Sequence, residues 1–166
     1  LETSHLARMR VAVDGKVVDT RVLNDCLYAN RNPAMTSRYF VVFRGVNEEQ
    51  KSSGIWIGPA TGSTAAIGSA GGRRLSPRSR MVQFVVREPY KPDGGRYACH
   101  QGLVPPGDAL EIWNKMREAA LFLDGPRTVV HLEIGQRVRF DLSPERLNVI
   151  GFAPGTTSLQ KPQRAG

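Results

Sequence analysis

The stretch VHLEIGQRVRFDL, residues 130–142, decides the fold class. Its apolar residues occupy every second position: Val130, Leu132, Ile134, and then Val138, Phe140 and Leu142. A repeat of two places successive side chains on opposite faces of the backbone, as in a β-strand with one buried face. The stretch therefore predicts two strands rather than a helix.

Other extended runs, some alternating and some continuously apolar, predict strands over most of the remaining chain. They cover residues 8–13, 16–28, 38–44, 54–58, 80–86 and 110–123. Residues 110–120 also have a composition that suits a helix, but their period of two favours a strand. Asp14-Gly15 and Asp124-Gly125 are typical of the turns in β-hairpins.

Many short strands with frequent turns predict an all-β fold, a two-sheet β-sandwich with one short helix after the TGSTAA segment of residues 61–66. Residues 1–152 are expected to form a single domain and residues 153–166 a loose tail. Within the domain, residues 47–51 indicate a solvated turn, and residues 88–108, rich in Pro and Gly, an irregular connection.

Charge and composition narrow the classes of partner. The 166 residues carry 23 Lys and Arg against 15 Asp and Glu, a formal net charge of +8, which favours nucleic acid, an acidic surface or phosphorylated small molecules. No apolar run is long enough to cross a membrane, and no signal peptide is recognisable. Cys26 and Cys99 are expected to be reduced core thiols, which favours a cytoplasmic protein.

Two segments carry side chains suited to ligand binding. In residues 23–25, LND, polar groups interrupt an apolar run. They indicate either a turn stabilised by Asx hydrogen bonds or a ribose site, in which Asp25 accepts from hydroxyls and Asn24 both donates and accepts. Residues 58–72, GPATGSTAAIGSAGG, form either a generic tight turn or a loop that a ligand approaches closely. Trp56 and Trp113 are expected in core or interface packing.

Taken together, the two segments resemble the motifs of the NAD kinase family. That family has an Asn-acid pair on a strand, here Asn24-Asp25, and downstream a TGSTAY segment followed by SAGG, here TGSTAA and SAGG at residues 61–66 and 69–72. The late Asp124-Gly125 is similar to the closing Asp-Gly hairpin of the family. The resemblance covers nearly the whole chain, although only the two motifs are specific.

The resemblance implies an activity and a site. Members phosphorylate the 2′-hydroxyl of the adenosine ribose of NAD to give NADP, with ATP or polyphosphate and Mg as donor, and many are homo-oligomers. By this match NAD would be bound by Asn24, Asp25, Thr61, Gly62, Ser63, Thr64, Ala65 and Ser69. The chain resembles only the C-terminal NAD-binding β-sandwich domain of these enzymes.

Three departures from the family pattern matter for function. The sequence contains no Gly-Gly-Asp-Gly, the segment with which the N-terminal α/β domain of the family binds phosphates. Ser53 stands where the family usually has an aspartate before glycine, and Ala66 replaces the tyrosine of TGSTAY. We therefore assign no catalytic or metal-binding residue, and expect the chain to be catalytically incomplete alone.

Two alternatives follow from the same residues. Ser53 and Ala66 are compatible with a relative that phosphorylates another hydroxyl, on a sugar or a lipid. The positive charge is compatible with a non-catalytic nucleic-acid-binding β-domain, although the aromatic residues Tyr39, Phe40 and Phe43 lie in a run that is expected to be buried rather than presented to bases.

Overall fold

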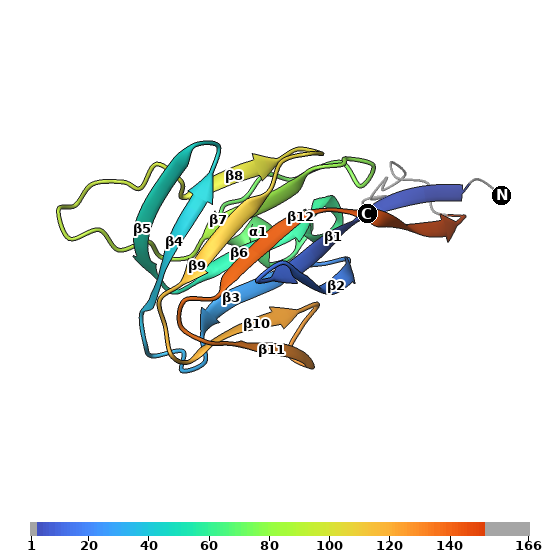
Figure 1. Cartoon of the computed structure of the whole chain (residues 1–166). Coiled ribbons are helices and arrows are strands. Elements are labelled where there is room, and N and C mark those ends of the chain that lie inside the picture. The colour runs from blue at the N-terminus through green and yellow to red at the C-terminus, as the bar shows by residue number, and fades with distance from the viewer. Residues whose placement is uncertain (1–2, 152–166) are drawn as a thin grey trace, which may run out of the picture.

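The computed structural model describes residues 3–151, which form two antiparallel six-stranded sheets (Figure 1). The first sheet, in the order β2-β1-β12-β9-β4-β5, contains β1 (Thr3–Val13), β2 (Lys16–Val22), β4 (Ser37–Phe43), β5 (Val46–Ser52), β9 (Leu110–Asn114) and β12 (Arg137–Ile150). The second sheet, in the order β11-β10-β3-β6-β7-β8, contains β3 (Cys26–Asn30), β6 (Ile55–Pro59), β7 (Val82–Val86), β8 (Gln101–Val104), β10 (Ala119–Leu123) and β11 (Thr128–Leu132). The all-β sandwich predicted from the sequence is confirmed.

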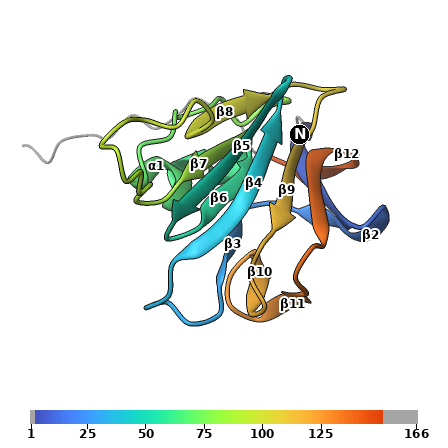
Figure 2. The same ribbon diagram turned by 60° about the vertical axis from the view of Figure 1, so that its left-hand side comes forward.

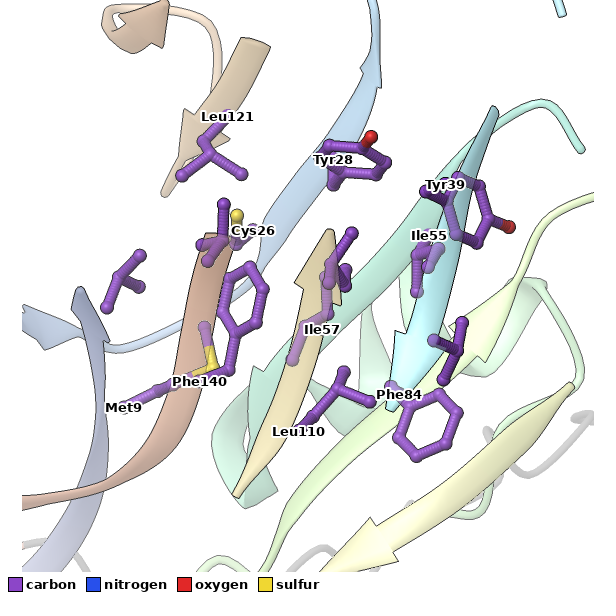
Figure 3. Packing of buried hydrophobic residues seen from close by; sticks show 14 of the residues in the cluster. Met9, Cys26, Tyr28, Tyr39, Ile55, Ile57, Phe84, Leu110, Leu121 and Phe140 are labelled. Carbon is purple, nitrogen blue, oxygen red and sulfur yellow. The ribbon is translucent and has the colours of Figure 1, made fainter. Parts of the chain in front are cut away.

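Alternate side chains of the two sheets meet in one hydrophobic core (Figure 3). Tyr28 of β3 meets Tyr39 of β4 edge to face, with ring centroids 5.4 Å apart. The Tyr28 hydroxyl donates to Asn114 Oδ1 over 2.8 Å, so a buried hydrogen bond joins the sheets. Cys26 and Cys99 are both free and buried, as expected for reduced thiols.

The short helix follows the TGSTAA segment as predicted. A 3₁₀ turn, η1 (Ala60–Thr64), leads into α1 (Ala66–Ser69), which lies on the side of β6 and β7 away from β4 and β9 (Figure 2). Fully buried Ile67 packs α1 onto this outward face. A Cβ on Gly58 would lie only 2.9 Å from Ile67 Cδ1, so the glycine makes room for the helix.

Residues 16–28, predicted as one extended run, form two strands in different sheets. The chain leaves the first sheet after Val22 and enters the second at Cys26. The residues between them make no ladder pairing because their N–H groups bind the carboxylate of Asp124 instead. A distant acceptor therefore ends β2, where the apolar pattern would have continued it.

Residues 47–51, predicted as a solvated turn, lie within β5, and the prediction is wrong. The side chain of Glu48 accepts the N–H groups of Ala98 and Cys99, and Gln50, fully buried, donates to Cys99 O over 2.9 Å. These partners satisfy polar side chains that would otherwise favour solvent. The prediction of an irregular connection over residues 88–108 likewise missed β8.

The alternation over residues 130–142 is confirmed except at Ile134 and at Leu142, which is only half-buried while Asp141 and Ser143 beside it are buried. Leu132 and Phe140 are buried, but Ile134 is 60% exposed because it lies in the turn between β11 and β12, where Gln136 N donates to Glu133 O. The predicted tail, residues 153–166, lies outside the described residues. Within residues 3–151, no helix has the length and apolar character needed to cross a membrane.

Candidate functional site

A single carboxylate shapes the turn that carries the amide–acid pair. Asp124 Oδ1 accepts the N–H groups of Asn24 (2.7 Å) and Asp25 (3.2 Å), and its Oδ2 accepts that of Leu23 (3.0 Å). The N–H group of Asp124 in turn donates to Asp25 O over 2.8 Å. Asp124 has a left-handed backbone (φ 50°) in the hairpin between β10 and β11, and from there it fixes the conformation of residues 23–25.

The two side chains of the pair have different surroundings. Asp25 is only 6% exposed, whereas Asn24 is exposed and its Nδ2 donates to Asp25 Oδ2 over 3.3 Å. Burial, together with the neighbouring charge of Asp124, raises the pKa of Asp25 above its ordinary value. A carboxylate that is costly to keep charged gains from hydroxyl groups that donate to it, as a ribose would.

The second motif packs directly on this turn. The Thr61 hydroxyl donates to Leu23 O. A Cβ on Gly62 would lie 1.7 Å from Asn24 O, and one on Gly58 would lie 2.5 Å from the same oxygen. No larger residue fits at either glycine without displacing the turn. The structure therefore brings the two motifs into backbone contact.

The remaining motif residues lie further along η1 and α1. Ser63 is 1% exposed, and its hydroxyl accepts Leu75 N over 2.9 Å, so it secures the following loop. Thr64 and Ser69 are exposed and Ala65 is half-buried. Of these residues, Thr64 and Ser69 present hydroxyls at the surface, whereas Ser63 is engaged internally.

Two hollows open on the outward face of the second sheet and share the wall made by Trp56. One, of about 300 Å³, is lined by Asp25, Leu27, Trp56, Phe122, Gly125 and Pro126. The other, of about 560 Å³, has a lining that includes Trp56, Ala66, Ser69, Ala70, Arg87 and Glu88. Asp25 and Ser69 therefore face adjacent hollows, with the Trp56 side chain between them.

The sequence reasoning missed two residues of this site. From the sequence, Asp124 indicates only a hairpin turn, because nothing local indicates an acceptor for residues a hundred positions earlier. The sequence predicts core or interface packing for Trp56, and the core part of this prediction is wrong. Trp56 points away from the core and lines both hollows, with the guanidinium carbon of Arg87 5.7 Å from its ring centroid. The alternation of Trp56 with the core residues Ile55 and Ile57 could have placed it on the outward face.

Comparison with known proteins identifies the family of the chain. No family model matches the chain. It is 31% identical over 156 residues to a probable NADH kinase of Oryza sativa subsp. japonica, covering 90% of this chain and 48% of that protein. It is 29% identical over 142 residues to an NAD kinase of Methanospirillum hungatei, covering 83% of this chain and 50% of that protein. The chain belongs to the NAD kinase family.

The fold agrees with this NAD kinase assignment. The crystal structure of yeast NADH kinase complexed with NADH superposes with a TM-score of 0.77 at 17% identity, over 92% of this chain and 45% of the yeast chain. The chain spans about half the length of the curated NAD kinase relatives described above. The shared fold is therefore that of one part of an NAD kinase.

Proposed function

We propose that this chain is the dinucleotide-binding part of an NAD kinase-type enzyme, which phosphorylates the 2′-hydroxyl of the adenosine ribose of NAD or NADH. The observation that carries the proposal is the direct contact between the turn at Asn24-Asp25 and the segment at Thr61-Gly62, next to two hollows on one face. Backbone contact of this kind fixes an acidic acceptor and a hydroxyl-rich loop relative to each other before any ligand arrives.

In this proposal the chain binds and orients the acceptor substrate. Asp25, at the edge of the smaller hollow, accepts from ribose hydroxyls, and Asn24 beside it donates and accepts. Thr64, Ala65 and Ser69 border the nicotinamide side of the dinucleotide. Thr61, Gly62 and Ser63 act on the ligand indirectly, since their contacts hold the turn and the following loop in place.

The donor lies with the remainder of the enzyme. Phosphoryl transfer needs an in-line donor phosphate and a metal ion that spreads its charge. Within residues 3–151, no three or more His, Cys, Asp and Glu side chains are grouped so that they could hold a metal ion. We therefore assign ATP or polyphosphate with Mg to the N-terminal α/β domain with its Gly-Gly-Asp-Gly segment, which is the partner this proposal requires. We also propose that the enzyme is a homo-oligomer, as the resemblance to the family implies. A cytoplasmic location is supported by the two free thiols.

Isothermal titration calorimetry of this chain with NAD and NADH tests the proposal. We expect saturable binding of at least one of them, at least tenfold weaker in Asp25→Ala than in the original chain. Ser143→Ala, on β12 outside the two hollows, is the control variant and should leave the affinity unchanged. Absence of dinucleotide binding at millimolar concentration would refute the proposal.

The alternatives predict different titrations. A nucleic-acid-binding domain would bind a short oligonucleotide with an affinity that falls steeply with salt, and would not distinguish Asp25→Ala from the original chain. A kinase relative for another hydroxyl substrate would bind a sugar or a lipid headgroup in preference to NAD and NADH. Either result would replace the dinucleotide as the proposed ligand.

A further inference from the structure

The family motifs account for only part of the lining of the larger hollow beside Trp56. Ala66 and Ser69 belong to the TGSTAA and SAGG segments, and they face the hollow from α1. The lining also includes Arg87 and Glu88, which directly follow β7 and belong to no motif identified in the sequence. A third hollow, of about 300 Å³, is also lined by Arg87 and Glu88. Arg87 and Glu88 therefore border two hollows, of which only the larger is also lined by Trp56.

The backbone of Glu88 has an unusual conformation for its residue type. Its φ is 45°, in the left-handed region that Gly, Asn and Asp adopt far more readily than Glu. The preceding residue is fixed on both sides, since Arg87 N donates to Gly54 O (2.8 Å) and Ser53 N donates to Arg87 O (3.0 Å). Strained positions of this kind are concentrated at ligand-binding sites, where the side chain has a use that the backbone alone would not favour.

The carboxylate of Glu88 is held in position and still has an open acceptor. The Ser53 hydroxyl donates to Glu88 Oε2, while Oε1 makes no hydrogen bond to the residues that the structure describes. Arg87 is also oriented, because its Nη1 donates to Ser53 O over 3.3 Å and its guanidinium lies against the Trp56 ring. The result is an oriented acceptor on an exposed residue, in a hollow that Trp56 and Ser69 also line.

We propose that Glu88 is a binding residue that determines specificity, its carboxylate accepting a hydrogen bond from an uncharged N–H or O–H group of the dinucleotide in the hollow beside Trp56. The inference rests on the proposed function and adds a recognition element to it. Three kinds of group have this chemistry: the nicotinamide carboxamide, the exocyclic amino group of adenine and a ribose hydroxyl. Ser53, which stands where the family usually has an acid, contributes to binding by orienting the carboxylate of Glu88 and supplies no carboxylate of its own.

Calorimetric titration of the Glu88 variants tests this assignment. We expect Glu88→Ala to weaken binding of NAD or NADH at least tenfold, and Glu88→Gln, which keeps one acceptor oxygen, to weaken it less. In the double variant Ser53→Asp/Glu88→Ala, the carboxylate is moved to the neighbouring position, and affinity should recover to within about threefold of the original chain. Glu118→Ala, on an exposed loop outside this hollow, is the matched control and should leave binding unchanged.

A glycine variant separates binding from folding. Glu88→Gly removes the carboxylate but relieves the left-handed backbone, so its melting temperature should equal or exceed that of the original chain while its dinucleotide affinity falls like that of Glu88→Ala. A purely structural role for Glu88 would instead lower the melting temperature of the alanine variant and leave the affinity unchanged.

Titration with nicotinamide mononucleotide and with ADP-ribose identifies which part of the dinucleotide donates the hydrogen bond to Glu88. The fragment whose affinity falls in Glu88→Ala carries the group that Glu88 binds. If the original chain and Glu88→Ala bind the dinucleotides equally, the role of Glu88 is refuted and the proposed function stands. If the original chain binds neither NAD nor NADH, the proposed function is refuted and the inference fails with it.

Discussion

The carboxylate of Asp124 organises the candidate site from a position remote in sequence. It accepts three successive backbone N–H groups, and it lies close enough to Asp25 to add to the effect of burial on the pKa of that side chain. Because the folded-state pKa of Asp25 is raised, its ionisation opposes folding, and this destabilisation develops as the pH rises from the unfolded-state pKa through the folded-state pKa. The turn therefore holds Asp25 in surroundings that disfavour its charged form.

Asp124→Asn tests this arrangement at the residue scale. The amide keeps one acceptor oxygen, so we expect the free energy of unfolding to fall by about 1–3 kcal/mol. Removing the negative charge should also lower the pKa of Asp25, observable as a shift of its side-chain carboxyl carbon titration to lower pH. Asp93→Asn, in an exposed loop, is the control and should leave the Asp25 titration where it was. An unchanged Asp25 titration in Asp124→Asn would contradict the coupling.

At the scale of elements, the end of β9 fastens the two sheets together. Asn114 is 2% exposed and uses its whole hydrogen-bonding capacity. Its Oδ1 accepts from the Tyr28 hydroxyl and from Met116 N, and its Nδ2 donates to Met116 O and Glu133 O. One side chain thereby joins β9 to β3 and also holds the turn before β12.

Substitutions at the two ends of this link should differ in cost. Asn114→Leu leaves four polar groups without that partner, and we expect it to lower the free energy of unfolding by at least about 3 kcal/mol. Tyr28→Phe removes one hydrogen bond and leaves Asn114 Oδ1 bonded to Met116 N, so it should cost only about 1 kcal/mol. Urea denaturation of both variants measures the two values. Equal losses would show that the contacts with Met116 and Glu133 contribute nothing.

Elements with one buried face were predictable from the sequence, and elements stabilised by distant polar partners were not. The run of aromatic and β-branched residues within 38–44 indicates β4 because such residues favour a strand through their own local preference. The sequence did not predict β5, because the partners that satisfy its polar residues Glu48 and Gln50 lie around Cys99, far along the chain. For the same reason, the two motifs of the candidate site were recognisable locally, whereas their connection through Asp124 was visible only in the fold.

At the scale of the whole molecule, the chain interleaves the two sheets. It passes from β2 to β3, β3 to β4, β5 to β6, β8 to β9, β9 to β10 and β11 to β12, changing sheet at each of these steps. Pairs such as β1 with β12 and β3 with β10 join residues far apart in sequence. Neither sheet can lose its strands without disrupting the other, so residues 3–151 are expected to unfold as one unit.

Single-tryptophan variants test this cooperativity. Trp56 lies in the second sheet and Trp113 in the first, so Trp113→Phe and Trp56→Phe each leave a fluorescent probe in one sheet. In each variant, the fluorescence and the far-ultraviolet circular dichroism should change together in urea, because loss of one sheet exposes the core of the other. A fluorescence change at a lower urea concentration than the dichroism change would indicate that one sheet unfolds separately.

Trp113→Phe keeps the proposed binding face intact, and NAD at one hundred times its dissociation constant should stabilise this variant by about 2.7 kcal/mol by both signals. If Trp56 fluorescence shows the stabilisation and circular dichroism does not, the ligand orders only the binding face of the second sheet.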